Sequence, residues 1–190
     1  ATFKADAWIN QEGRFDITKI DIAEDKNHIY KYGKIAISKS KDGGKYKELT
    51  YEYGKDDKYG YFENKIIEES DGKTFATFGE SNYAKDKNAV YYNGKKIEGA
   101  NVKTFITIEL THETYAKDEN AIYFKGEKIE NADISTFKIG GTIERGSYSY
   151  AKDKNNVYYG GKILSIADAK TFKDLPEGYA IDKKYVYYSG

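Results

Sequence analysis

Residues 83–97 read YAKDKNAVYYNGKKI, and this stretch recurs along the chain. Close copies occupy residues 115–129 and 150–163, more divergent copies occupy 53–66 and 22–35, and a last copy begins at residue 179. The leading aspartates of the copies stand about 30 residues apart. A repeat of that length predicts an array of small supersecondary units, each of which buries its apolar face against its neighbours.

Each copy carries two turn signals. Asn93-Gly94 is typical of a two-residue hairpin turn, and Asp86-Lys87-Asn88 is typical of a tight turn in which the Asp carboxylate accepts backbone N–H groups. Alternation along the strand between them places Val90 and Tyr92 on one face and Tyr91 on the other. One unit is therefore predicted to be a three-stranded meander.

A second motif, Asp-x-x-Thr-Phe, follows each meander. It stands at residues 71–75, 133–137 and 168–172, at 101–105 with Asn first, and at 42–46 with Tyr last. We expect a short turn or a single helical turn capped by the Asp, with the Phe inserted between neighbouring units. A lone unit leaves its apolar face wet, so stability is expected to come from stacking.

The predicted fold class is therefore all-β, a tandem repeat of about six three-stranded units in one domain over residues 1–190. Residues 1–21 are an irregular segment, and the units start near residues 22, 53, 83, 115, 150 and 179. The chain begins on Thr2-Phe3-Lys4, the tail of the second motif, and ends before the last copy reaches its own. Two readings stay open: a fragment of a longer open array, or a propeller-like ring that the N-terminal segment completes.

Composition excludes several classes of protein. The 31 basic and 31 acidic residues balance, which disfavours nucleic acid as a partner. Without Cys the chain has no disulfide framework, zinc finger or thiol nucleophile. The uncharged runs are too short for insertion into a membrane. No nucleotide-binding or hydrolase motif is present, so we expect no enzyme activity, no catalytic residue, no metal site and no cofactor.

The tyrosines are the most suggestive candidates for contact with a partner. Of the rings in each Tyr-Tyr pair, we expect one in the core and one in an exposed ladder, since Tyr is favoured at protein interfaces. Departures from the repeat add further candidates, among them the only Trp. The expected contact residues are Trp8, Phe15, Tyr46, Tyr51, Tyr53, Tyr91, Tyr123 and Tyr158.

The repeated motif resembles that of the DKNYY family of bacterial repeat proteins. The resemblance is specific over residues 83–105, 115–137 and 150–172, weaker over 23–61, and partial at the C-terminus. It implies a non-catalytic bacterial protein and transfers no site residue.

Two kinds of partner are expected. The first is another protein, and one specific version is an immunity protein that binds and neutralises a toxin. The alternative is a glycan or the cell envelope, with sugars stacked on the repeated tyrosines. A chain that starts at Ala1 suggests a processed or trimmed product. The compartment stays unknown, with the cell envelope, periplasm or secretion favoured over the cytoplasm.

Overall fold

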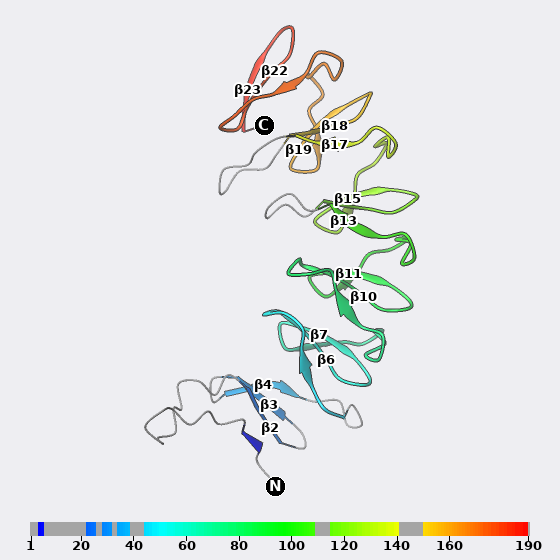
Figure 1. Ribbon diagram of the computed structural model, residues 1–190, viewed down its shortest axis with the longest axis vertical. Helices are drawn as coiled ribbons and strands as arrows, with labels where there is room; N and C mark the ends of the chain where they lie inside the picture. Colours follow the sequence, from blue (N-terminus) through cyan, green and yellow to red (C-terminus); the bar gives the residue numbers. More distant parts are fainter. Residues whose placement is uncertain are drawn as a thin grey trace. The chain divides into compact units, whose positions relative to one another are not determined.

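The computed structural model describes residues 4–5, 22–25, 28–31, 34–38, 44–108, 115–140 and 150–189. Over these residues the chain is all β and forms six small antiparallel sheets, none of which closes into a barrel. Each sheet is a meander in which neighbouring strands are also consecutive in the chain (Figure 1). The described residues contain no helix that could span a membrane.

The sheets follow the repeat. The first comprises β1 (Lys4–Ala5), β2 (Ile22–Glu24), β3 (His28–Lys31) and β4 (Lys34–Ser38). The second comprises β5 (Lys47–Glu48), β6 (Tyr53–Lys55), β7 (Gly60–Phe62) and β8 (Lys65–Ile67). The third comprises β9 (Ala76–Thr77), β10 (Tyr83–Lys85), β11 (Val90–Tyr92) and β12 (Lys95–Lys96).

The C-terminal half continues the same order. The fourth sheet comprises β13 (Ile106–Ile108), β14 (Tyr115–Lys117), β15 (Ile122–Phe124) and β16 (Glu127–Lys128). The fifth comprises β17 (Lys138–Ile139), β18 (Tyr150–Lys152), β19 (Val157–Tyr159) and β20 (Lys162–Ile163). The sixth has three strands in the described chain: β21 (Lys173–Asp174), β22 (Tyr179–Ile181) and β23 (Val186–Tyr188).

The predicted repeat and its all-β class are confirmed, and each sheet has in addition a short leading strand. This strand comes directly after the Thr-Phe of the second motif and pairs with the first strand of the expected meander. In the fifth sheet, Ile139 of β17 lies opposite Ala151 of β18. The same motif therefore connects two sheets and supplies the edge strand of the second.

The two-residue turns form where the sequence predicts them. Asn93 and Gly94 both have positive φ, 48° and 72°, as a type I′ turn requires. At the matching turn of the fifth sheet, φ is 77° at Gly161, and a Cβ there would come within 2.6 Å of the Phe124 ring. Glycine at this point therefore serves both the turn and the close approach of the preceding sheet.

The cores lie between consecutive sheets, because each sheet is apolar on both faces. We call the face that carries Ala151 and Tyr158 in the fifth sheet the leading face; it packs on Tyr115 and Phe124 of the fourth sheet. The opposite, trailing face carries Tyr150 and Val157, in the sixth sheet's cluster with Phe172, Ala180 and Tyr187. The fifth sheet thus has a neighbour on each side, and its two faces contribute to two separate cores.

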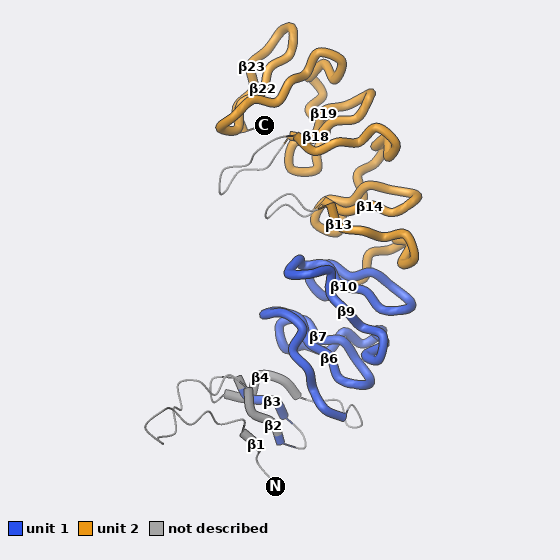
Figure 2. The backbone as a smooth tube through the Cα atoms, in the orientation of Figure 1, with its two compact units in different colours: residues 1–95 blue, residues 96–190 orange. Residues whose placement is uncertain are grey.

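The chain divides into two compact units, residues 1–95 and residues 96–190 (Figure 2). Within unit 1, the core between the second and third sheets contains Tyr53, Phe75 and Tyr91. Within unit 2, the cores between the fourth, fifth and sixth sheets have the same composition. The repeat is therefore built by the same packing rule in both units.

Candidate functional site: the Asp turns and the C-terminal sheet face

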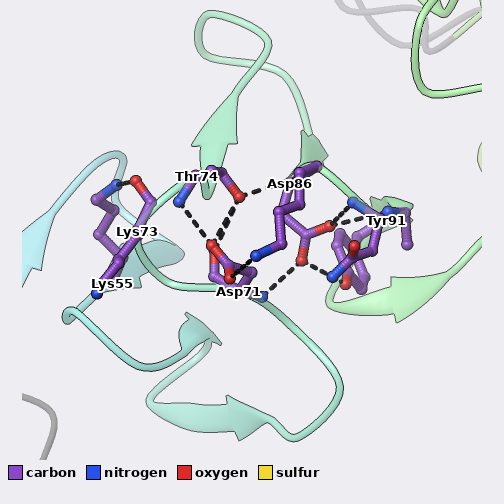
Figure 3. A network of polar contacts seen from close by, with 9 residues as sticks. Lys55, Asp71, Lys73, Thr74, Asp86 and Tyr91 are labelled. Atoms are coloured by element: carbon purple, nitrogen blue, oxygen red, sulfur yellow. Dashed lines mark hydrogen bonds and ion pairs between the residues drawn. The ribbon is translucent and has the colours of Figure 1, made fainter.

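The leading aspartates of the second to sixth sheets are buried inside the first turn of their sheet. Asp86 Oδ1 accepts the backbone N–H groups of Asn88 and Ala89 at 2.7 and 2.8 Å. Its Oδ2 accepts the Tyr91 hydroxyl at 2.9 Å and the N–H of Asp71, in the preceding motif, at 2.7 Å. Figure 3 shows these donors converging on one carboxylate. The predicted role of Asp as a turn former is confirmed.

The same four donors, of three kinds, recur in unit 2. The carboxylates of Asp118, Asp153 and Asp182 each accept two turn N–H groups, one Tyr hydroxyl and one N–H from the preceding motif. A carboxylate offers about four acceptor positions, so these four donors occupy all of them. Among the described residues, no cluster of three or more His, Cys, Asp or Glu could hold a metal ion.

Electrostatics keep these carboxylates charged and the bonded phenols neutral. Burial alone would raise the pKa of Asp118, but hydrogen bonds from Asn101 N–H, the turn amides and Tyr123 hold that pKa below its usual value. Burial, with the hydrogen bond to Asp182, raises the pKa of the Tyr187 hydroxyl to about 12. The pairs therefore act as fixed structural hydrogen bonds at neutral pH.

A second contact locks each motif to the following turn. Lys87 Nζ lies 2.6 Å from Asp71 Oδ2, and Lys87 N–H donates to Thr74 Oγ1 at 3.1 Å. The Lys87 ammonium and the Thr74 hydrogen bonds lower the pKa of Asp71 to about 2. Lys154 with Asp133 and Lys183 with Asp168 repeat the ion pair at 2.6 Å. The predicted Asp-capped turn is thus confirmed, in the form of a turn without a helix.

Most of the tyrosines expected to contact a partner are buried. The exposed ladder expected at Tyr91, Tyr123 and Tyr158 is wrong, and Tyr46 and Tyr53, expected as contact residues in irregular segments, also belong to the core. The physical reason is that a sheet with a neighbour on each side is covered on both faces, so alternation does not leave one ring of the pair in water. Tyr46 packs edge-on against Tyr61, with ring centroids 5.5 Å apart.

The other expected contact residues divide into two groups. Tyr51 is exposed over 76% of its surface, and its role as a contact residue stays a prediction. Trp8 and Phe15 lie outside the described residues.

The trailing face of the sixth sheet carries several exposed apolar side chains. Tyr179 lies directly opposite Tyr188, and Ile181 lies directly opposite Val186, so the four side chains form one patch. Their exposures are 43%, 63%, 37% and 67%. We call these four residues the C-terminal patch. Sequence reasoning missed it, because alternation along a strand does not show which sheet face another unit covers.

The comparisons with known proteins concern the family. The chain matches the model of the DKNYY family over residues 9–113 and again over residues 53–190. The comparisons with curated proteins and with solved structures yield no match.

Proposed function

The chain belongs to the DKNYY family, and from that premise we propose that it is a non-catalytic repeat module whose function is to bind another protein. The observation that carries the proposal is the C-terminal patch. Two tyrosines, an isoleucine and a valine share one exposed sheet face. An exposed apolar sheet face rich in aromatics is typical of a protein interface.

The composition of the patch favours a protein over a sugar polymer. A polymer of period matched to the array would need one exposed ring in each unit. The repeated rings Tyr91, Tyr123 and Tyr158 are buried and hydrogen-bonded to aspartates. Exposed aromatic rings instead gather in the last sheet, which suits a single partner surface.

The hydrogen bonding of the acidic residues supports the non-catalytic part of the proposal. General acid–base catalysis needs a carboxyl group within reach of a substrate proton. The buried aspartates use their oxygens on backbone and tyrosine donors instead, as Asp153 does with Asn155, Asn156 and Tyr158.

A specific version is an immunity protein, which neutralises a toxin by covering its active surface. Such a role needs a rigid exposed surface and no chemistry, and the C-terminal patch meets that need. In this version the captured partner, expressed alone, arrests bacterial growth, and co-expression of this chain restores it.

The test compares three immobilised baits in an affinity capture from a bacterial lysate. Val186→Lys puts a charge in the patch, and Ile166→Lys is the matched control, because Ile166 is 66% exposed but lies outside β22 and β23. We expect one protein to be retained by wild type and by Ile166→Lys and to be lost with Val186→Lys. Mixing the purified partner with wild type should then reproduce a complex of fixed stoichiometry.

Two results would overturn the proposal. One is capture of no protein by the wild-type bait. The other is that wild type, Val186→Lys and Ile166→Lys all bind a cell-wall or polysaccharide resin and are released by soluble sugar. That result would favour the glycan-binding alternative.

A further inference from the structure

The two-residue turn between β11 and β12 of the third sheet contains the one Asn-Gly pair of the sequence, Asn93-Gly94. Asn93 is exposed to solvent. An asparagine that precedes glycine loses its side-chain amide readily, because a following residue without a Cβ lets its backbone nitrogen reach the asparagine Cγ. The matching turns of the fourth and fifth sheets, Lys125-Gly126 and Gly160-Gly161, have no side-chain amide. The third sheet therefore carries a chemistry that those two turns cannot perform.

The reaction needs water as its only added reactant. The Gly94 backbone nitrogen bonds to Asn93 Cγ, the Cγ–Nδ2 bond breaks, and Nδ2 leaves as ammonia with the proton that the Gly94 nitrogen lost. A five-membered succinimide remains. Water that attacks Cγ cleaves the new C–N bond and leaves aspartate. Water that attacks the Asn93 main-chain carbonyl cleaves the original peptide bond instead, so that the chain runs through the side-chain carbonyl as isoaspartate.

The second sheet holds the nitrogen that would react. Gly94 N–H donates to the Tyr53 hydroxyl at 3.0 Å, and that hydroxyl donates to the Asn82 carbonyl at 2.9 Å. The Asn82 carbonyl also accepts the Asn93 N–H at 3.1 Å. To reach Cγ, the Gly94 nitrogen must lose its proton and turn away from Tyr53, so this hydrogen bond must break first. The hydrogen bonds therefore oppose the reaction while the second and third sheets are packed together.

The fit around the turn strengthens this restraint. Tyr53 is 1% exposed, and its ring centroid lies 4.9 Å from that of Phe62. A Cβ at Gly94 would come within 2.6 Å of Phe62 Cβ, so the turn lies directly on the second sheet. Asn82 Nδ2 donates to Asn93 Oδ1 at 2.6 Å and so restricts the side chain that would react. Burial raises the pKa of the Tyr53 hydroxyl well above its usual value, so the hydroxyl stays neutral in mildly alkaline solution.

Asp71-Gly72 is protected from the related rearrangement of aspartate. An aspartate forms the same succinimide through its neutral acid. The Lys87 ammonium and the Thr74 hydrogen bonds lower the pKa of Asp71 to about 2, and Gly72 N–H donates to the Lys58 carbonyl at 3.0 Å. That pair is thus protected at both the carboxyl group and the nitrogen, whereas the neutral amide of Asn93 depends on its hydrogen bonds alone.

We propose that Asn93-Gly94 is a latent self-modification site, kept unreactive by Tyr53 of the second sheet and released when the second and third sheets separate. The aspartate product can stay in the turn, because its Oδ1 can still accept the Asn82 Nδ2 hydrogen bond. Isoaspartate adds an atom to the main chain, which a two-residue turn cannot accommodate. Separation of the two sheets would thus become irreversible with time. The site is independent of the proposed binding function.

The test measures the conversion of residue 93 in mildly alkaline buffer. Mass spectrometry of the peptide that contains residue 93 detects loss of the amide, and methylation by an isoaspartyl methyltransferase detects isoaspartate. Tyr53→Phe keeps the ring and removes the hydroxyl. We expect it to react about two- to tenfold faster than wild type, as expected for the loss of one hydrogen bond. Asn93→Gly copies the Gly160-Gly161 turn and should show no conversion at this position.

The matched control is Tyr115→Phe, which removes the equivalent hydroxyl in unit 2, where Tyr115 Oη accepts the Gly161 N–H at 3.3 Å. Residue 93 of this variant should react at the wild-type rate. In urea, wild type and Tyr53→Phe should react equally, and both faster than folded wild type. Circular dichroism in buffer checks that each variant is folded.

Three results would overturn the proposal. The first is an equal rate for folded and denatured wild type, which would mean that the fold does not protect the site. The second is a Tyr53→Phe rate equal to that of wild type. The third is an acceleration by Tyr115→Phe as large as that by Tyr53→Phe, which would show that a general loss of stability, and not the bond to Gly94, exposes the site.

Discussion

Two sheets of similar sequence, the fifth and the sixth, differ in what covers them. Val157 and Tyr150 lie on the trailing face of the fifth sheet and are at most 2% exposed. Val186 and Tyr179 hold the same positions in the sixth sheet and are 67% and 43% exposed. The difference shows that the apolar strand residues of this repeat become core only when a following unit packs on them. Stability should therefore be a property of interfaces between sheets.

The largest expected effect comes from removing a ring at such an interface. Tyr115→Ala deletes a ring that packs on Phe124 and Phe137 and accepts the Gly161 N–H. Loss of a buried aromatic side chain should lower the free energy of unfolding by about 3 to 5 kcal/mol. Tyr179→Ala removes the equivalent but exposed ring and should cost about 1 kcal/mol or less. Urea denaturation followed by circular dichroism measures both, and equal losses would refute the interface rule.

The next effect concerns the hydrogen bonds of the turn aspartates, which the fourth, fifth and sixth sheets share. Asp118→Asn replaces an acceptor-only carboxylate with a group that has one acceptor oxygen and an NH₂ donor. At least one of the donors from Asn101, Ala121 and Tyr123 would then face another donor. We expect a loss of about 2 to 3 kcal/mol in the free energy of unfolding.

A double-mutant cycle separates this hydrogen bonding from packing. Tyr123→Phe removes only the hydroxyl donor, so combining it with Asp118→Asn should cost less than the sum of the single changes. Strict additivity in urea melts would show that the carboxylate and the phenol do not act together.

These comparisons also explain what the sequence predicts well. The turns depend on local chemistry: Asn93-Gly94 needs positive φ, and Asp86 accepts amides two and three residues ahead. Such features are readable because each involves residues close in the chain. The insertion of the motif phenylalanine between units was also predictable, since Phe75 follows its meander at a fixed distance and cannot be covered by one small sheet.

The solvent exposure of the strand side chains could not be predicted, because it depends on residues about 30 positions away in the next unit of the repeat. Alternation separates Tyr158 from Val157, but both faces of the fifth sheet are covered within its unit, so both residues are buried. The short leading strands were missed for a different reason. Ala76–Thr77 is too short for alternation to mark a strand, and its pairing with β10 follows from the path of the preceding motif.

A smaller effect is expected at alkaline pH. The Tyr187 hydroxyl is partly shielded and bonded to Asp182, which raises its pKa to about 12 from an unfolded value near 10. A raised pKa means that the neutral phenol stabilises the fold. This contribution is complete below about pH 10 and is lost as pH rises through about 12. The urea midpoint of wild type should therefore fall over that range, and that of Tyr187→Phe should fall less. Identical pH profiles would contradict a stabilising role for the phenol.

The smallest expected effect on stability is that of Val186→Lys, and it completes the comparison of the two sheets. The change should stay within about 0.5 kcal/mol, because the side chain is 67% exposed. Val157→Lys buries an unpaired charge and should unfold the fifth sheet. Urea denaturation followed by circular dichroism measures both variants. A Val186→Lys variant as unstable as Val157→Lys would mean that the trailing face of the sixth sheet is already core, and the difference between the two sheets would disappear.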